Sequence, residues 1–118
     1  MVSDVPVEAE DLTKRFGNVI AVEGINFSVK KGSVVGLLGG NGAGKTTTMS
    51  LLMGLVIPSA GEARIFGEDA SKRSAPALAR INFSSPYVEM PGRLTVEENL
   101  QVYARLFGVV HAEERIAE

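Results

Sequence analysis

A glycine-rich stretch near the middle of the sequence has the residue types and spacing of a phosphate-binding loop. It reads Gly39-Gly40-Asn41-Gly42-Ala43-Gly44-Lys45-Thr46 and matches the pattern G-x-x-x-x-G-K-[ST]. Glycines let backbone N–H groups turn towards phosphate oxygens, and the N-terminus of a following helix adds partial positive charge. Lys45 can reach the β- and γ-phosphates of a nucleotide, and the Thr46 hydroxyl can ligate Mg²⁺. The alternative is a chance glycine-rich turn, which the matching fixed positions and the flanking elements disfavour.

The stretches on both sides of this loop are the ones that a phosphate-binding loop requires. Residues 34–38 are continuously apolar, which predicts a parallel strand covered on both faces. A helix is expected from about Lys45 to Met53, with Gly54 near its C-terminus. Apolar and polar residues alternate over 25–29, and Ala63, Ile65 and Gly67 alternate with Arg64 and Phe66, so two further strands are predicted. Turns are expected at 17–18, 30–32 and 58–61.

The C-terminal part of the sequence has helical signals. Pro76 marks the start of a short helix, and residues 81–83 are a candidate strand. Thr95 and Glu98 form a capping box that opens a longer helix, and a last helix is expected to start near His111. The apolar face of the longer helix consists, at helical spacing, of Val96, Leu100, Tyr103, Ala104 and Phe107.

The composition excludes several other classes of protein. The 118 residues carry a formal net charge of −2, which argues against a nucleic-acid binder with a basic stripe. The absence of cysteine excludes disulfide scaffolds, cysteine-ligated zinc sites and cysteine nucleophiles. The first residues lack the features of a secretory signal, and the apolar stretch 51–57 is far shorter than the roughly 20 residues that span a bilayer. We therefore expect a soluble, cytoplasmic chain.

Five stretches of distinctive sequence occur in one order along the chain. They are residues 12–17, 21–27, 39–47, 54–62 and 94–100. From about residue 7 to residue 110, the sequence resembles the N-terminal half of an ATP-binding cassette (ABC) ATPase, the nucleotide-binding subunit of membrane transporters. The resemblance implies an α/β fold, namely a P-loop NTPase of the ABC type with a parallel sheet core and an N-terminal antiparallel β-subdomain. It implies the nucleotide-binding core in residues 1–86 and the start of the helical subdomain in residues 87–118.

The same resemblance assigns roles to residues around the loop. Phe16 lies where the family stacks an aromatic ring on adenine, the alternative being that it packs the small sheet. Val22 contacts the same base or is an ordinary core residue, and Thr47 contacts the α-phosphate. The implied cofactors are ATP and Mg²⁺, with Thr46 as the metal ligand. The implied nucleotide-binding residues are Phe16, Val22, Gly39, Gly40, Asn41, Gly42, Ala43, Gly44, Lys45, Thr46 and Thr47.

The sequence departs from the family pattern at two places. Gly40 stands where the family usually has proline, which is expected to loosen the entrance of the loop. Pro86 stands where the family usually has a glutamine that contacts Mg²⁺ or the attacking water and links the core to the membrane partner. Proline has no side-chain donor or acceptor, so a hydroxyl of Ser84 or Ser85 is the alternative substitute.

The later motifs of the family do not occur in this sequence. There is no Leu-Ser-Gly-Gly, no apolar strand after residue 47 ends in Asp-Glu, and His111 lies in a polar stretch typical of a surface residue. We therefore expect a truncated domain without catalytic residues, which binds ATP and Mg²⁺ at best. A strand at 34–38 without its neighbours exposes apolar surface, so we also expect self-association, strand exchange or aggregation.

The implied function is that of the ATP-binding part of an ABC transporter ATPase, which couples ATP binding and hydrolysis to transport and is most similar to prokaryotic exporters. The implied partners are a second ABC ATPase domain and a transmembrane permease at the inner face of the cell membrane, and no nucleic acid. Two alternatives are a soluble, non-transport ABC ATPase and a non-catalytic fragment that docks on a membrane subunit through residues 84–100. A GTPase would need Asn-Lys-x-Asp and Asp-x-x-Gly, which the sequence lacks.

Overall fold

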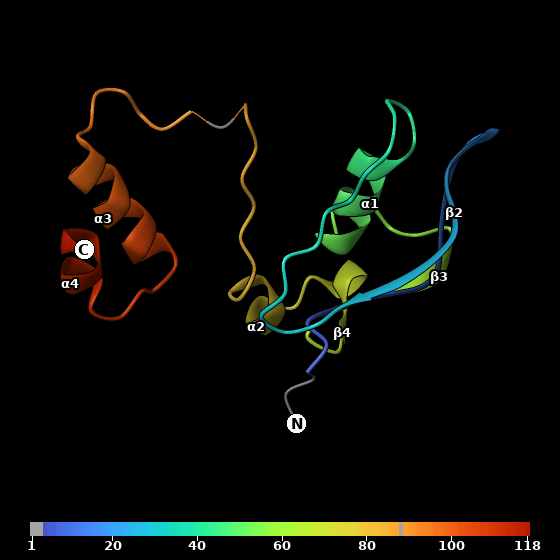
Figure 1. Cartoon of the computed structure of the whole chain (residues 1–118), viewed down its shortest axis with the longest axis horizontal. Helices are drawn as coiled ribbons and strands as arrows, with labels where there is room; N and C mark the ends of the chain where they lie inside the picture. The colour runs from blue at the N-terminus through green and yellow to red at the C-terminus, as the bar shows by residue number, and fades with distance from the viewer. Residues whose placement is uncertain (1–3, 88) are drawn as a thin grey trace. The chain divides into compact units, whose positions relative to one another are not determined.

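The computed structural model describes residues 4–87 and 89–118, which form two compact units (Figure 1). The first unit runs to Arg80, and the second runs from Ile81 to Glu118. Each unit is described by itself. The division expected from the sequence, after residue 86, stays a prediction.

The first unit is built on an antiparallel sheet. In the described residues this sheet has four strands in the order β2-β1-β3-β4. The tight turn at residues 17–18 joins β1 to β2, as expected, and β3 pairs with the other edge of β1. The expected N-terminal antiparallel sheet is therefore confirmed. Its strands are β1 (Val7–Phe16), β2 (Val19–Val29), β3 (Ala60–Ile65) and β4 (Glu68–Asp69).

Helix α1 (Lys45–Leu52) lies against one face of this sheet and has the bounds that the sequence predicts to within a residue (Figure 1). Leu12 of β1 and Leu51 of α1 are almost completely buried, so they form the centre of the core. Gly54 has φ 66° just beyond the helix, which is the left-handed conformation expected there. The other buried apolar residues of this unit are Ala9, Val22, Ala63, Ile65, Ala70 and Ala77.

Two short helices complete the first unit. The 3₁₀ helix η1 (Ala70–Lys72) begins at Asp69, whose Oδ1 accepts hydrogen bonds from the Ser71 amide at 2.9 Å and the Ser71 hydroxyl at 2.6 Å. Helix α2 (Ala75–Leu78) begins at Ser74, whose hydroxyl accepts from the Ala77 amide, and it has a proline in its first turn. The helix start expected at Pro76 is therefore confirmed.

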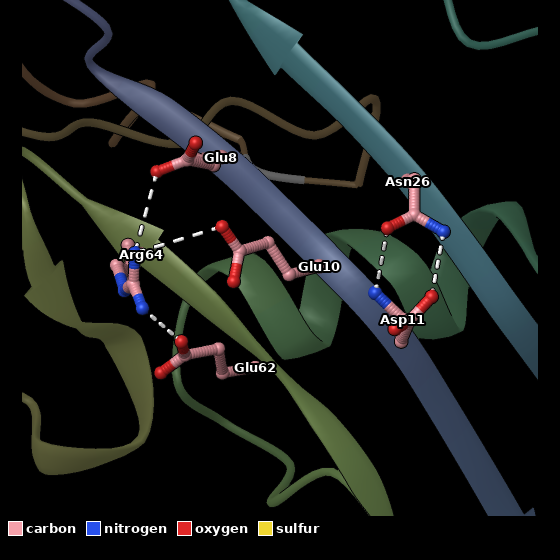
Figure 2. Close-up of polar contacts among 6 residues, drawn as sticks. All are labelled: Glu8, Glu10, Asp11, Asn26, Glu62 and Arg64. Atoms are coloured by element: carbon pink, nitrogen blue, oxygen red, sulfur yellow. Dashed lines mark hydrogen bonds and ion pairs between the residues drawn. The ribbon is translucent and has the colours of Figure 1, made fainter.

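The sheet face turned away from α1 carries a cluster of charged side chains (Figure 2). Nη1 of Arg64 lies 3.7 Å from a carboxylate oxygen of Glu8 and 3.8 Å from one of Glu10, and its Nη2 contacts Glu62. The attraction of the Glu62 carboxylate is the main cause that raises the pKa of Arg64. These side chains are partly exposed, so this face lies outside the apolar core.

The segment between β2 and α1 differs from the sequence prediction. Residues 34–38 form no strand, so the prediction of a parallel strand there is wrong. Val34 is fully exposed and Leu38 is 92% exposed. A continuously apolar strand needs neighbours on both edges, whereas each strand pairing within residues 4–87 and 89–118 is antiparallel. The described residues therefore do not form the parallel core.

Two shorter predictions also need correction. Residues 81–83 form no strand, and the Asn82 side chain accepts a hydrogen bond from the Phe83 amide at 2.7 Å, a local contact that competes with strand pairing. The turn expected at 58–61 ends early because Ala60 and Gly61 belong to β3. Gly61 has φ 68°, and a β-carbon there would lie 2.2 Å from the Asp11 carbonyl oxygen.

The second unit contains helices α3 (Val96–Leu106) and α4 (Ala112–Ala117), as expected. The capping box at the start of α3 is confirmed: the Thr95 amide donates to Glu98 Oε2 at 2.8 Å, and the Glu98 amide donates to Thr95 Oγ1 at 3.2 Å. The expected apolar face is covered only in part, since Ala104 is buried and Val96 is 76% exposed. Within the described ranges, each helix is too short or too polar to cross a bilayer.

Candidate phosphate-binding site

The glycine-rich loop leads directly into the N-terminus of α1. Gly44 is the N-cap residue of α1. It has φ 88°, a conformation that glycine adopts without strain. Its carbonyl oxygen accepts from the Thr48 amide and from the Thr48 hydroxyl, both at 2.8 Å. These bonds fix the last residue of the loop to the first turn of the helix.

Gly44 also lets the loop approach β2 closely. A β-carbon built on Gly44 would lie 2.2 Å from the Ala21 carbonyl oxygen and 3.2 Å from Cγ2 of Val22. No side chain fits in this space, so glycine is the residue that the contact requires. Val22 is 6% exposed and packs at this contact, and its contact with a base stays a prediction.

The two glycines at the entrance of the loop have different surroundings. A β-carbon on Gly39 would lie 3.0 Å from Cβ of Ala43, whereas Gly40 has open space around it. The Ala43 amide donates to the Gly40 carbonyl oxygen at 3.2 Å. The Lys45 ammonium donates to the Gly39 carbonyl oxygen and, at 2.7 Å, to the Gly40 carbonyl oxygen. The loop is therefore folded around the lysine of its own motif.

The charge distribution at the N-terminus of α1 suits an anion. The first turn of α1 has no acidic side chain, so the partial positive charge of the helix N-terminus is not offset there. Lys45 adds a full positive charge at the same end. A cavity of about 350 Å³ lies between the loop and β2. Its walls include Ala21, Val22, Leu38, Gly42, Ala43 and Lys45, and Glu23 of β2 adds one carboxylate to them.

The donor set also fits a magnesium ion that arrives with a nucleotide. Thr46 is exposed and Thr47 is half-buried, and the Thr46 carbonyl is already engaged by the Ser50 hydroxyl at 2.9 Å. No group of three or more histidine, cysteine, aspartate or glutamate residues that could hold a metal occurs among residues 4–87 and 89–118. Mg²⁺ typically takes one or two protein oxygens together with phosphates and water, so a single threonine hydroxyl is consistent with this cation.

Phe16 lies apart from the loop, at the β1 end of the hairpin turn. Its ring is half exposed, and the Lys14 ammonium lies 5.0 Å from the ring centroid. Lys14 Nζ also donates to the Ile57 carbonyl oxygen at 2.8 Å, in the segment that follows α1. Phe16 is not among the residues that line the cavity. The structure thus brings Val22 and the loop together but does not join Phe16 to them.

The other expected positions add detail. Asn41 and Gly42 are exposed at the tip of the loop, and Gly42 has φ 82° with open space around it. Pro86 belongs to the second unit, where the Ser85 hydroxyl accepts from the Tyr87 amide at 3.2 Å. The role of this segment stays a prediction.

Sequence reasoning missed two residues that position the loop. Thr48 anchors Gly44 through its hydroxyl, and the spacing of four residues inside an expected helix is the signal that could have shown this. Ala21 limits the residue at position 44 through its carbonyl group. That contact joins positions far apart in the sequence, so no local pattern reveals it.

A glycine-rich loop that caps a helix, with a lysine in the first helical turn, defines the nucleotide-binding class of the P-loop proteins. The ABC transporter family matches residues 22–118, so the chain belongs to the ABC transporter family. It is 42% identical over 115 residues to the bacitracin transport ATP-binding protein BcrA of Bacillus licheniformis, covering 95% of this chain and 36% of that protein. It is 41% identical over 107 residues to the Nod factor export ATP-binding protein I of Burkholderia orbicola, covering 91% and 35%.

A solved structure of the ATP-binding subunit of an ABC transporter superposes with a TM-score of 0.78 at 31% identity. The match covers 92% of this chain and 46% of that one. The expected ABC-type fold is thereby confirmed. The chain spans about a third of the length of the two relatives named above.

Proposed function

We propose that residues 39–47 bind the phosphates of ATP together with Mg²⁺, and that Phe16 stacks on the adenine. The observation that carries this proposal is the loop itself, which caps α1, lies against β2 through Gly44 and is folded around Lys45. Backbone N–H groups of such a loop are donors for phosphate oxygens. The exposed ring of Phe16 offers a flat apolar surface to a base.

Each side chain has a separate part in this proposal. The Lys45 ammonium exchanges the carbonyl oxygens of Gly39 and Gly40 for oxygens of the β- and γ-phosphates. The Thr46 hydroxyl holds Mg²⁺, which neutralises phosphate charge when bound, and Thr47 contacts the α-phosphate. The proposed contact of Val22 with the base is secondary to its packing on Gly44.

The wider function proposed is that of the ATP-binding part of an ABC transporter ATPase of the exporter type. Family membership and the transport and export functions in the names of the relatives support it. On this proposal the chain acts at the cytoplasmic side of a membrane, with a second ABC ATPase domain and a transmembrane permease as partners. These 118 residues are proposed to bind nucleotide without turning it over, because the sequence lacks the later motifs of the family.

Calorimetric titration of the 118-residue chain with Mg·ATP tests nucleotide binding. We expect one site per chain and an affinity at least about tenfold lower for Lys45→Ala, which loses a charge-assisted contact to phosphate. Lys72→Ala is the matched control, because Lys72 is an exposed lysine in the same unit, in η1. Equal affinities of wild type and Lys45→Ala would refute the proposed site. ATP turnover that disappears in Lys45→Ala would refute the proposal that the chain is inactive.

A further inference from the structure

Strand β1 contains a bulge at Asp11 that both neighbouring strands share. Ala9 pairs with Phe27 and Leu12 with Ile25, so β1 has one residue more than β2 between these pairs. The pairing with β3 is shifted at the same place. Asp11 has φ 45°, a left-handed conformation that is uncommon for any residue other than glycine. Such a bulge needs contacts that hold it in place.

Asn26 of β2 supplies these contacts (Figure 2). Its Oδ1 accepts from the Asp11 amide at 2.9 Å, and its Nδ2 donates to Asp11 Oδ1 at 2.9 Å and to the Gly24 carbonyl oxygen at 3.1 Å. The Gly24 amide donates in turn to Thr13 Oγ1 at 2.9 Å. Gly24 has φ 56° and lies where β2 has an extra residue, so one asparagine joins the irregular points of both strands.

The bulge decides which face of the sheet carries the residues that follow it. Side chains of a regular strand alternate, so residues three apart lie on opposite faces. Ala9 and Leu12 are three apart, and both are buried. Without the extra residue, Phe16 would share a face with Glu8 and Glu10, on the side of the Arg64 cluster.

With the bulge in place, the end of β1 faces the side of α1. The pairing of β1 with β2 shifts again between Leu12 and Arg15, so spacing alone does not place these side chains. Lys14 pairs with the buried Val22 and therefore lies on the core face. The Lys14 ammonium lies 5.0 Å from the Phe16 ring centroid and donates to the Ile57 carbonyl oxygen, in the segment that leaves α1. The ring is thus presented on the side of the sheet that bears the phosphate-binding loop.

We propose that Asp11 and Asn26 are a positioning pair, which fixes the bulge and so determines the face on which Phe16 is presented to a base. Neither residue contacts the nucleotide in this proposal. The part that concerns the base rests on the proposed function, whereas the part that concerns the bulge does not. The pair acts on the adenine end of the ligand and leaves the phosphate end unchanged.

Effects at the adenine end and at the phosphate end can be distinguished with two ligands. Mg·ATP has both ends, whereas Mg·tripolyphosphate has no base. For Asn26→Ala we expect an affinity for ATP about tenfold lower and an affinity for tripolyphosphate within about twofold of wild type. The exchanged pair Asp11→Asn with Asn26→Asp restores the bond between the side chains and the acceptor for the amide of residue 11, so it should recover most of the loss. Ser28→Ala, on the same strand two residues further, is the matched control.

A second measurement does not depend on nucleotide. Cross-strand nuclear Overhauser effects between Leu12 and Ile25 report the pairing beyond the bulge, and we expect Asn26→Ala to weaken them while the Ala9–Phe27 contacts remain. Equal losses for ATP and tripolyphosphate, or no loss for either, would overturn the inference. If the wild-type chain binds neither ligand, the proposed function fails, and an unchanged Leu12–Ile25 pairing in Asn26→Ala would then overturn the positioning role as well.

Discussion

The ammonium of Lys45, the first residue of α1, donates a hydrogen bond to the carbonyl oxygen of Gly40 at 2.7 Å. The lysine is therefore held inside its own loop, and it also contacts the Gly39 carbonyl. A compact ammonium with rotatable donors suits both this position and a phosphate oxygen.

Lys45→Arg tests whether charge alone suffices at this position. A planar guanidinium keeps the charge, but it is larger and has a fixed arrangement of donors, so it cannot replace an ammonium enclosed by the loop. We expect the affinity for Mg·ATP to fall at least about tenfold, with a melting temperature within a few degrees of wild type. Calorimetric titration and thermal unfolding measure the two quantities. Wild-type affinity in Lys45→Arg would show that the shape of the loop matters little.

Alanine at two loop glycines should have unequal effects on stability. Both Gly42 and Gly44 have positive φ, so each substitution strains the backbone by about 1 kcal/mol or somewhat more. A β-carbon on Gly42 meets open space, whereas one on Gly44 would lie 2.2 Å from the Ala21 carbonyl oxygen. We therefore expect Gly44→Ala to lower the free energy of unfolding by about 3 kcal/mol or more. Gly42→Ala should lower it by about 1 kcal/mol.

Urea unfolding of both variants provides the comparison, with Gly42→Ala as the control for backbone strain. Equal losses of stability in the two variants would mean that the loop does not lie against β2 as described.

Asp69 should make stability depend on pH in the acid range. Hydrogen bonds from the Ser71 hydroxyl and then from the Ser71 amide lower the pKa of Asp69. Because the folded-state pKa is depressed, the stabilisation is present above the ordinary carboxyl pKa and is lost as the pH falls through the folded-state value. The difference in stability between wild type and Asp69→Ala should therefore be present at pH 7 and narrow below about pH 4.

A titration of the Asp69 carboxyl by nuclear magnetic resonance gives the direct test. In Ser71→Ala the pKa of Asp69 should move back towards its ordinary value, since the hydroxyl donor is gone. An unchanged pKa in this variant would contradict the assigned cause.

The exposed apolar segment 34–38 should promote association between chains. Val34 is fully exposed there, and an extended apolar stretch with unpaired backbone groups is prone to pair with another chain. We expect Val34→Lys to shift the chain towards monomer in sedimentation velocity over a range of concentrations. Leu55→Lys, at a 59% exposed leucine after α1, is the control and should leave association unchanged. A wild-type chain that is monomeric at every concentration would disprove this expectation.

Local sequence patterns predicted the elements whose contacts are local. They did not predict which distant segments pair with one another. The loop, α1 and the Thr95–Glu98 capping box were predictable because all their contacts lie within a few residues. The prediction of a strand at 34–38 was wrong because an apolar stretch forms a strand only where another strand pairs with it. β1 escaped notice because its bulge breaks the alternation, and Asp11 and Asn26 are 15 residues apart.

In the candidate site too, local contacts were predictable from the sequence and contacts between distant segments were not. Gly39 to Thr46 could be assigned from spacing, and their roles in binding stay predictions. The contact between Gly44 and Ala21 could not be foreseen, because it depends on how α1 packs on the sheet.

The Arg64 cluster has a consequence for how this sheet tolerates substitution. The Arg64 guanidinium contacts the carboxylates of Glu8, Glu10 and Glu62. If one carboxylate is removed, the guanidinium therefore keeps its contacts with the other two. The cation has no such substitute, because its removal leaves like charges facing one another across β1 and β3. We therefore expect the sheet to tolerate a neutral residue at any one of the three glutamates better than a neutral residue at Arg64.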